Sequence, residues 1–294
     1  MTIKQALNFA KQSLDSIEAK TLIKHTLKKD NMYITINEDK EITKNEELEF
    51  ISSLKKIKEG YPLQYITHHQ EFMGLDFEVN EDVLIPQPDT EVLVENTIKL
   101  VLENFSKNSS DDFQRQNVIT NGIRGELKKN KSTTNLKILD LCTGSGAIAI
   151  ALKKYLPNIL VFASDISEKA LKIAQKNAKN NNVEVSFIKS NMFENINNKF
   201  DLIVSNPPYI KSSEISKLPK QVQNEPKIAL DGGKDGLDFY KIIYNEAPKF
   251  LNEKGIILLE IGYDQGLAVT NIFKNSKIIK DYAGNDRVIV WFAK

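Results

Sequence analysis

From residue 136 to the carboxyl end, short apolar runs alternate with longer amphipathic segments. Apolar runs bounded by turn residues are typical of buried strands, and the segments between them have the period of helices. The pattern predicts strands near 137–141, 159–164, 184–189, 200–205, 255–261, 277–282 and 287–292. It predicts helices near 146–155, 167–181, 236–251 and 264–275. This alternation predicts an α/β fold with a parallel sheet covered on both faces. The turn at 283–286 predicts a final antiparallel hairpin.

A glycine turn follows the first strand of this predicted sheet. It consists of Cys142, Thr143, Gly144, Ser145 and Gly146. Glycines let the backbone pass close to a ligand, and the helix N-terminus behind them attracts negative groups. Asp165 ends the second strand, where a carboxylate can accept both hydroxyl hydrogens of a ribose. The structural alternative for Asp165 is a helix cap, but Ser167 already occupies the position expected for that cap.

Two nucleotide cofactors fit this unit. The spacing Gly144-x-Gly146-x-x-Ala149 satisfies the dinucleotide fingerprint, so NAD is one candidate. Asp140, at the mouth of the first strand, would repel a pyrophosphate but suits the positive sulfonium of S-adenosylmethionine. We therefore expect S-adenosylmethionine, with Asp140 among its binding residues.

The fourth strand ends in a second candidate site, which consists of Asn206, Pro207, Pro208 and Tyr209. Proline lacks an N–H and forces the residue before it into an extended conformation, so two prolines end the strand and leave carbonyls without ladder partners. Asn206 adds an amide oxygen, and Tyr209 adds a flat ring. These groups predict a slot for a planar –NH2 group; the structural alternative is a proline turn with a capping Asn. Because ligands bind beyond the carboxyl ends of strands, this loop and the glycine turn meet if their strands are neighbours.

The two candidate sites together indicate transfer of a methyl group to an amide or amino nitrogen. An amide nitrogen is a weak nucleophile because its lone pair is delocalised, so we expect catalysis chiefly by positioning. Its hydrogens become more acidic during attack, and the Asn206 oxygen and the Pro207 carbonyl then accept stronger hydrogen bonds. Tyr209 is expected to hold the amide plane by stacking. We expect neither a general base nor a metal ion.

Several motifs resemble those of the peptide chain release factor glutamine-N5 methyltransferases over most of the chain. The matching segments are 62–67, 71–74, 84–91, 140–149, 206–210 and 284–288. The Asn-Pro-Pro-Tyr loop is shared with nucleic-acid amino-methyltransferases, whereas the segment 86–91 is far more specific. The chain departs from the family pattern at Gln87, where Arg is usual, and at Met192, where an aromatic residue is frequent.

The resemblance implies methylation of the glutamine in the Gly-Gly-Gln motif of class I peptide chain release factors, with S-adenosyl-L-methionine as cofactor. It implies a seven-stranded doubly wound class I methyltransferase (Rossmann-like) domain, a small N-terminal helical domain and a β-hairpin connection. Its cofactor contacts would fall on residues 142–146, Asp165 and Met192. Its substrate contacts would fall on residues 206–209, with Asn206 in both sets.

The sequence predicts three parts. Residues 1–60, with helices near 2–13, 16–29 and 44–59, form an N-terminal domain that the resemblance implies to be a substrate platform. A β-rich connection spans 61–88, and the methyltransferase domain spans 89–294, beginning with a helix at 89–105. Residues 106–134 are rich in Asn, Lys, Ser and Thr, so we expect a mobile surface insertion.

Charge and cysteine content narrow the functional class. The chain has 40 basic and 39 acidic residues, a formal net charge of +1, which gives no basic footprint for stable nucleic-acid binding. The single cysteine suits a reducing compartment, and no apolar stretch approaches the ~20 residues of a membrane span. We expect a cytoplasmic monomer. The alternatives are a methyltransferase for the exocyclic amino group of adenine or guanine in RNA or DNA, and a non-catalytic cofactor-binding scaffold.

Overall fold

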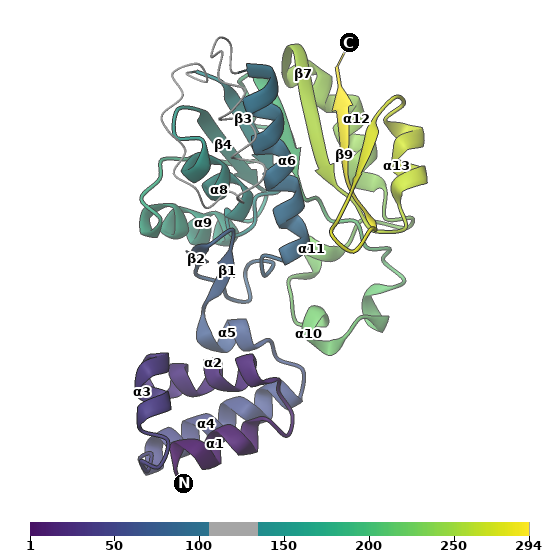
Figure 1. Cartoon of the computed structure of the whole chain (residues 1–294). Helices are drawn as coiled ribbons and strands as arrows, with labels where there is room; N and C mark the ends of the chain where they lie inside the picture. Colours follow the sequence, from purple (N-terminus) through teal and green to yellow (C-terminus); the bar gives the residue numbers. More distant parts are fainter. Residues whose placement is uncertain (106–134, 294) are drawn as a thin grey trace. The chain divides into compact units, whose positions relative to one another are not determined.

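The computed structural model describes residues 1–105 and 135–293, and the predicted insertion at 106–134 lies outside them. The packing divides the chain into two compact units, coloured along the sequence in Figure 1. The first comprises Met1–His69 and Lys217–Glu225, and the second comprises Gln70–Ser216 and Pro226–Lys294. The first unit thus extends beyond the expected boundary at residue 60. It also includes residues 217–225, which the sequence assigned to the second.

The N-terminal unit is helical, as predicted. Its helices are α1 (Ile3–Ala10), α2 (Ser16–Leu27), α3 (Asn31–Ile36), α4 (Lys44–Lys58), α5 (Leu63–Thr67) and α10 (Lys220–Gln223). Capping boxes at Thr2, Asp15 and Thr43 begin α1, α2 and α4, because each side chain accepts an otherwise unpaired helical N–H. The core includes Leu22 and Phe50, both fully buried. The sequence analysis missed α3, and it predicted a β-rich stretch where α5 forms.

The second unit contains a seven-stranded sheet. Its strands are β3 (Lys137–Leu141), β4 (Leu160–Asp165), β5 (Ser186–Lys189), β6 (Phe200–Ser205), β7 (Leu251–Glu260), β8 (Lys277–Lys280) and β9 (Asp286–Phe292). Their order is β5-β4-β3-β6-β7-β9-β8. Strands β3 to β7 pair in parallel, and β9 is antiparallel to both β7 and β8. Strands β3 and β6 are neighbours, which is the condition under which the two candidate sites meet, and the predicted final hairpin is confirmed.

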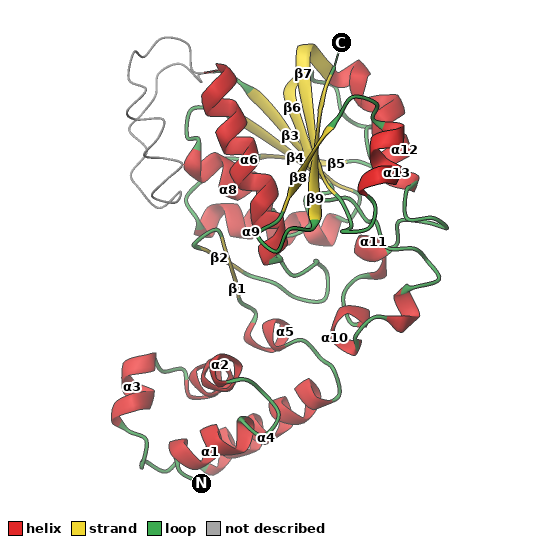
Figure 2. Cartoon of the chain, turned by 45° about the vertical axis from the view of Figure 1, so that its right-hand side comes forward, coloured by secondary structure: helices red, strands yellow, loops and turns green. Residues whose placement is uncertain are grey.

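Helices cover both faces of the sheet (Figure 2). They are α6 (Pro88–Phe105), α8 (Ala147–Tyr155) and α9 (Glu168–Asn180) on one face, and α12 (Asp238–Glu246) and α13 (Gly266–Ile272) on the other. The short elements are α11 (Lys227–Leu230) and the 3-10 helices Ile215–Lys217 and Ala247–Phe250. The helix predicted at 236–251 ends early because β7 already begins at Leu251. No helix in the described part of the chain has the length and apolar character needed to cross a membrane.

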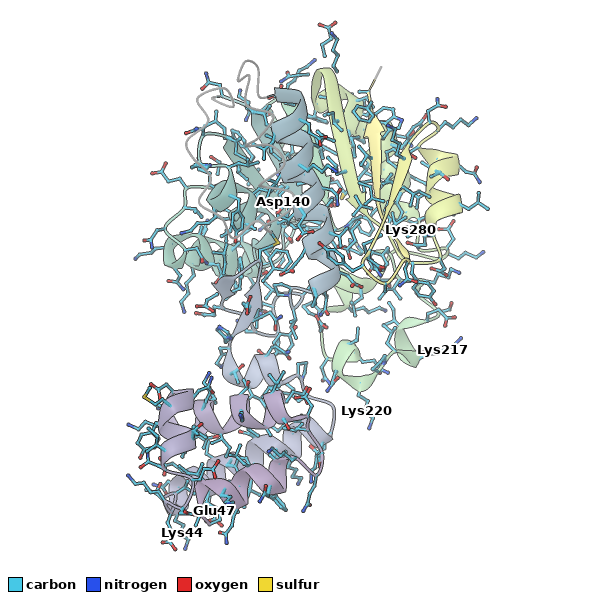
Figure 3. The ribbon with its side chains drawn as sticks, viewed as in Figure 1. Lys44, Glu47, Asp140, Lys217, Lys220 and Lys280 are labelled. Carbon is cyan, nitrogen blue, oxygen red and sulfur yellow. The ribbon has the colours of Figure 1, made fainter. Side chains whose placement is uncertain are left out.

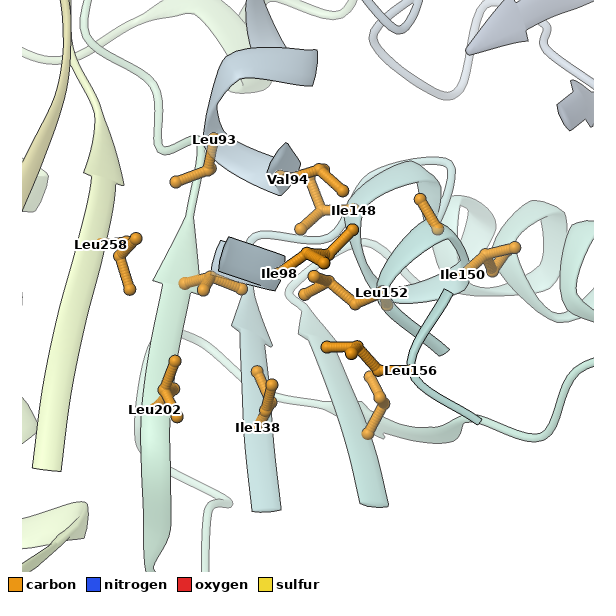
Figure 4. Packing of buried hydrophobic residues seen from close by; sticks show 14 of the residues in the cluster. Leu93, Val94, Ile98, Ile138, Ile148, Ile150, Leu152, Leu156, Leu202 and Leu258 are labelled. Atoms are coloured by element: carbon orange, nitrogen blue, oxygen red, sulfur yellow. The ribbon is translucent and has the colours of Figure 1, made fainter. Parts of the chain in front are cut away.

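Alternation along the central strands decides which side chains meet α6. Ile138, Leu202 and Leu258 pack under Val94 and Ile98 of α6 (Figure 4). Because side chains alternate between the faces of a sheet, the even-numbered residues that follow them point to the same face. These residues are Asp140 on β3, Asn206 just after β6 and Glu260 at the end of β7. The fold therefore directs three polar side chains toward the face that α6 and α8 cover, with Asn206 near Thr90 of α6 and Asp140 near Ala149 of α8.

A short hairpin joins the second unit to the chain before it. Its strands are β1 (Gln70–Phe72) and β2 (Leu75–Phe77), the β-hairpin connection that the resemblance implied. Tyr155 of α8 donates a hydrogen bond of 2.6 Å to the Met73 carbonyl, and Glu91 of α6 accepts one of 2.6 Å from the Met73 amide. The hairpin turn is thereby fastened to α6 and α8. No strand forms at 78–85, where the sequence predicted further β structure.

Candidate active site

The glycine turn leaves an open position at Gly144 and a closed one at Gly146. Gly144 has φ +55°, and a Cβ added there would meet no heavy atom within 4 Å. Gly146 has φ +83°, and its Cβ would lie 2.9 Å from Ile150 Cδ1 and 3.0 Å from Ala174 Cβ. The second glycine therefore permits close packing of α8 on α9, whereas the first leaves room beside the backbone for a ligand.

Asp165 closes this turn from the neighbouring strand. Its Oδ2 accepts the Gly144 amide at 2.8 Å, and its Oδ1 accepts the Ser167 amide at 2.9 Å. Ser167 caps α9, as predicted, by accepting the Ala170 amide. Burial raises the pKa of Asp165, and the two backbone hydrogen bonds oppose that rise. Each carboxylate oxygen keeps a second lone pair with which it can accept a hydroxyl group.

Asp140 lies within the second unit, where Figure 3 labels it, and its hydrogen bonds place it beneath the turn and not at its open mouth. It is fully buried, and its Oδ2 accepts the Thr143 hydroxyl at 2.5 Å and the Ala149 amide at 3.2 Å. No described residue hydrogen-bonds to its Oδ1. Burial raises the pKa of Asp140 to about 7. Asp140 therefore shapes the turn and the first turn of α8, and its effect on a ligand is through its charge.

Cys142 and Met192 form the remaining wall of the predicted cofactor site. Both have positive φ, +62° and +47°, and their sulfur atoms lie 3.9 Å apart. Burial raises the pKa of the Cys142 thiol, so this side chain stays protonated at neutral pH. Phe193, beside Met192, stacks on Phe250 with ring centroids 5.0 Å apart, so its ring is committed to the core.

The Asn-Pro-Pro-Tyr loop emerges beside the glycine turn. Leu141 of β3 pairs with Ser205 of β6, and the Ser205 hydroxyl donates to the Leu141 carbonyl. Cys142 and Asn206 therefore leave adjacent strands at the same level. Asn206 Nδ2 donates to Thr90 Oγ1 at 3.1 Å. Within residues 1–105 and 135–293, no hydrogen bond engages Asn206 Oδ1 or the Pro207 carbonyl, so both acceptors remain available.

Glu260 connects the two ends of this loop. It is 2% exposed, and both the Thr90 and the Tyr209 hydroxyl groups hydrogen-bond to its carboxyl group. Burial raises the pKa of Glu260 to about 7 against these hydrogen bonds and the nearby Arg287. Its Oε2 has no hydrogen-bond partner in the described part of the chain. The hydroxyl of Tyr209 is thus anchored, which restrains the position of a ring that the sequence assigned only to stacking.

The loop at 229–236 packs against the backbone of Tyr209. A Cβ on Gly232 would lie 2.7 Å from Tyr209 Cα, and one on Gly236 would lie 2.4 Å from the Tyr209 carbonyl oxygen. Gln265 donates to that carbonyl at 2.9 Å and to the Gly236 carbonyl at 3.2 Å. The glycines are needed for close packing of backbone on backbone. The segment therefore acts as a support for the Tyr209 backbone.

Arg287 fastens α6 to the final hairpin. Its guanidinium lies 2.9 Å from an Asp89 carboxylate oxygen and 3.2 Å from one of Asp281. Arg287 is 7% exposed and the Asp281 side chain 5%, so solvent screens this ion pair only weakly, whereas the Asp89 side chain is 56% exposed and its ion pair is screened more strongly. Asp89 and Glu91 lie in the first turn of α6, where acidic side chains favour the helix N-terminus. Both also make specific contacts, with Arg287 and with the Met73 amide.

The structure brings the predicted residues of both sites to one edge of the sheet and adds three that the sequence analysis missed: Thr90, Glu260 and Gln265. A signal for Glu260 was present, because it ends an apolar strand as Asp140 and Asp165 do. Thr90 lies in the family-like segment 86–91, but its contact with Asn206 carried no signal, since the two residues are 116 apart in the chain. Gln87, exposed, donates to the Ile85 carbonyl.

Comparisons with known proteins agree with this geometry. Residues 2–67 match the family described as PrmC N-terminal domain, and residues 123–234 match the methyltransferase small domain. A release factor glutamine methyltransferase of Clostridium acetobutylicum is 36% identical, covering 99% of this chain and 98% of the relative. A release factor glutamine methyltransferase of Thermodesulfovibrio yellowstonii is 39% identical, covering 98% of this chain and 95% of the relative. The fold is shared with a solved 16S rRNA methyltransferase of T. thermophilus in complex with AdoMet and guanosine. The two chains are 15% identical with a TM-score of 0.50, and the match covers 77% of this chain and 50% of that one.

Proposed function

The chain belongs to the release factor glutamine methyltransferase family, and from this premise we propose that it methylates the glutamine of the Gly-Gly-Gln motif in class I release factors. The acceptor atom is the side-chain amide nitrogen. The observation that carries the proposal is the parallel pairing of β3 with β6, because it brings the glycine turn and the Asn-Pro-Pro-Tyr loop to one edge. A cofactor site and an amide-binding slot at the same edge fit group transfer between them.

The residues at the glycine turn fit S-adenosyl-L-methionine. When bound, this cofactor supplies an activated methyl group on a positively charged sulfur. The open position at Gly144 admits the ligand beside the backbone, and Asp165 accepts the ribose hydroxyl groups. Met192 and Cys142 offer a polarizable apolar wall. The buried Asp140 has one unpaired oxygen and, when ionised, supplies negative charge beneath the turn, which a bound sulfonium would favour.

The Asn-Pro-Pro-Tyr loop binds the glutamine side chain. The two hydrogens of the substrate –NH2 group are accepted by Asn206 Oδ1 and the Pro207 carbonyl, which have no other hydrogen-bond partner in the described structure. Tyr209, tied at its hydroxyl to Glu260 and at its carbonyl to Gln265, presents a fixed ring to the amide plane. As the bond from nitrogen to the methyl carbon forms and the bond from that carbon to sulfur breaks, the nitrogen becomes positive and both acceptors bind its hydrogens more strongly, which lowers the barrier. One of these protons then leaves to solvent, so that the methylated amide is neutral.

The test is transfer of labelled methyl from S-adenosylmethionine to a purified class I release factor. The acceptor control is the factor with Gln→Ala in its Gly-Gly-Gln motif, and total RNA and DNA are parallel acceptors. We expect label on the factor that disappears with the control. Label on RNA or DNA alone would assign the site to the nucleic-acid class, and label on no acceptor would refute the proposed reaction.

Asn206→Ala tests the amide slot within the same assay. We expect kcat to fall by on the order of 100-fold, as for a lost oxyanion-hole group, with the Kd for S-adenosylmethionine within about threefold of wild type. Asn197→Ala, an exposed asparagine before β6, is the matched control. Equal losses of cofactor binding and turnover would place Asn206 in the cofactor site alone.

A further inference from the structure

We propose that Thr90 and Glu260 are positioning residues that fix which end of the Asn206 amide faces the methyl acceptor. The inference rests on the proposed function, and it concerns residues that lie outside the Asn-Pro-Pro-Tyr loop. An asparagine side chain presents two hydrogens at one end and an acceptor oxygen at the other. Rotation of the amide by half a turn would direct hydrogens at the substrate –NH2 group and abolish its binding.

With Glu260 ionised, the polarity of the contacts excludes the rotated amide. Thr90 has a single hydroxyl proton and two lone pairs. An ionised carboxylate can only accept, so the Thr90 hydroxyl donates its proton to Glu260. Thr90 Oγ1 can then only accept from Asn206, and it does so from Nδ2 at 3.1 Å. The donation therefore runs from Asn206 through Thr90 to Glu260, and it leaves Asn206 Oδ1 on the far side of the amide.

The sheet register holds the two ends of this chain of hydrogen bonds together. Ser205 of β6 pairs with Leu259 of β7, so Asn206 and Glu260 follow at the same level. Their side chains point to the face covered by α6, where Thr90 lies in the first helical turn and is 5% exposed. Adjacent strands are about 4.8 Å apart, a gap that one hydroxyl group can bridge.

Glu260 also orients the other end of the loop. The Tyr209 hydroxyl hydrogen-bonds to its carboxyl group, so one acceptor restrains both Asn206 and Tyr209. A buried carboxyl group with an unpaired Oε2 costs stability, which an apolar residue at the end of β7 would avoid. The geometry thus gives Glu260 a positioning role in place of a stabilising one.

The first test is a double-mutant cycle on the full chain with Asn206→Ala and Thr90→Val. Thr90→Val keeps the shape of the side chain and removes the hydroxyl. Alone, it should lower kcat for the release factor by about 10- to 100-fold and leave the Kd for S-adenosylmethionine unchanged. The range is that found when a residue that hydrogen-bonds to a metal ligand, and so orients it, is removed. In the Asn206→Ala protein it should change kcat by less than about twofold, because Thr90 acts through Asn206.

Conservative variants test the same relay. Thr90→Ser keeps the hydroxyl, and Glu260→Gln keeps one acceptor oxygen, so each should retain kcat within about threefold. Glu260→Met removes the acceptor and should resemble Thr90→Val. A loss of kcat that is equally large in the wild-type and Asn206→Ala backgrounds would overturn the proposal. So would wild-type kcat in Thr90→Val.

A readout that does not depend on activity separates this inference from the proposed reaction. In ¹⁵N-edited spectra, the Asn206 side-chain amide is identified by its loss in Asn206→Ala. One of its protons should be protected from solvent exchange in the wild type and in Thr90→Ser, and unprotected in Thr90→Val and Glu260→Met. If release factor is not methylated but the protection follows this pattern, the relay stands and the substrate assignment fails. Protection that persists in Thr90→Val would refute the relay whatever the substrate.

Discussion

Replacing Glu260 by glutamine should change how stability depends on pH. Burial raises the pKa of Glu260 from its usual value of 4.5 to about 7 in the folded chain. The folded state therefore binds a proton more readily than the unfolded state between these values, and the free energy of unfolding falls as pH rises through this range. A rise of this size corresponds to on the order of 3 kcal/mol of unfolding free energy. This contribution is fully present below the pKa of the unfolded state and is lost above the pKa of the folded state.

Glutamine is neutral at every pH, so the unfolding free energy of Glu260→Gln lacks this fall as pH rises. The difference in unfolding free energy between Glu260→Gln and wild type should therefore grow by on the order of 3 kcal/mol from about pH 5 to about pH 8. Asp140 and Asp165, whose pKa values burial also raises, contribute the same slope to both proteins and cancel in the difference.

The chain offers a specific probe for this measurement. Its single tryptophan, Trp291, lies on β9 and packs against Phe273 and Tyr244, so its fluorescence reports unfolding of the second unit alone. Urea titrations of the ligand-free protein followed at Trp291 give the unfolding free energy at each pH. Glu253→Gln, which removes an exposed carboxylate from the same strand, is the control. A difference that stays constant within about 0.5 kcal/mol would refute a charge-destabilised Glu260.

Two further predictions concern the glycine turn. Gly146→Ala should destabilise the second unit by about 1–3 kcal/mol, because its Cβ meets Ile150 and Ala174 and its φ is +83°. Gly144→Ala adds a Cβ that meets no protein atom, so it should cost only about 1 kcal/mol of backbone strain and yet weaken S-adenosylmethionine binding. Calorimetry measures the binding and the Trp291 titration measures the stability. Unaltered affinity would argue against a ligand at Gly144. Asp165→Asn should raise the Kd for S-adenosylmethionine by about 10- to 100-fold, as for a lost hydrogen bond to a charged group. The unfolding midpoint of the variant serves as the control that it is still folded. Unchanged affinity would exclude the ribose contact.

Much of the fold follows from local rules that a sequence carries directly. The apolar runs at 137–141 and 200–205 coincide with β3 and β6 because strand burial requires only a short stretch of suitable side chains. The glycine turn and the cap at Ser167 follow from backbone sterics and unpaired helical N–H groups. Short elements were less predictable: residues 63–67 form α5, although they were expected to be β-rich. Five residues carry too little periodicity to separate a helical turn from a strand.

The sequence by itself determined the strands and helices of the sheet, the glycine turn and the Asn-Pro-Pro-Tyr loop, because each depends on neighbours along the chain. Only the tertiary structure decided that β3 lies beside β6, since strand order depends on long-range packing. It also decided the bond from Asn206 to Thr90, the burial of Glu260, and the assignment of 217–225 to the N-terminal unit. A residue's type states which hydrogen bonds it can make, but its partner is set by the fold, which brings together groups that the chain keeps more than a hundred residues apart.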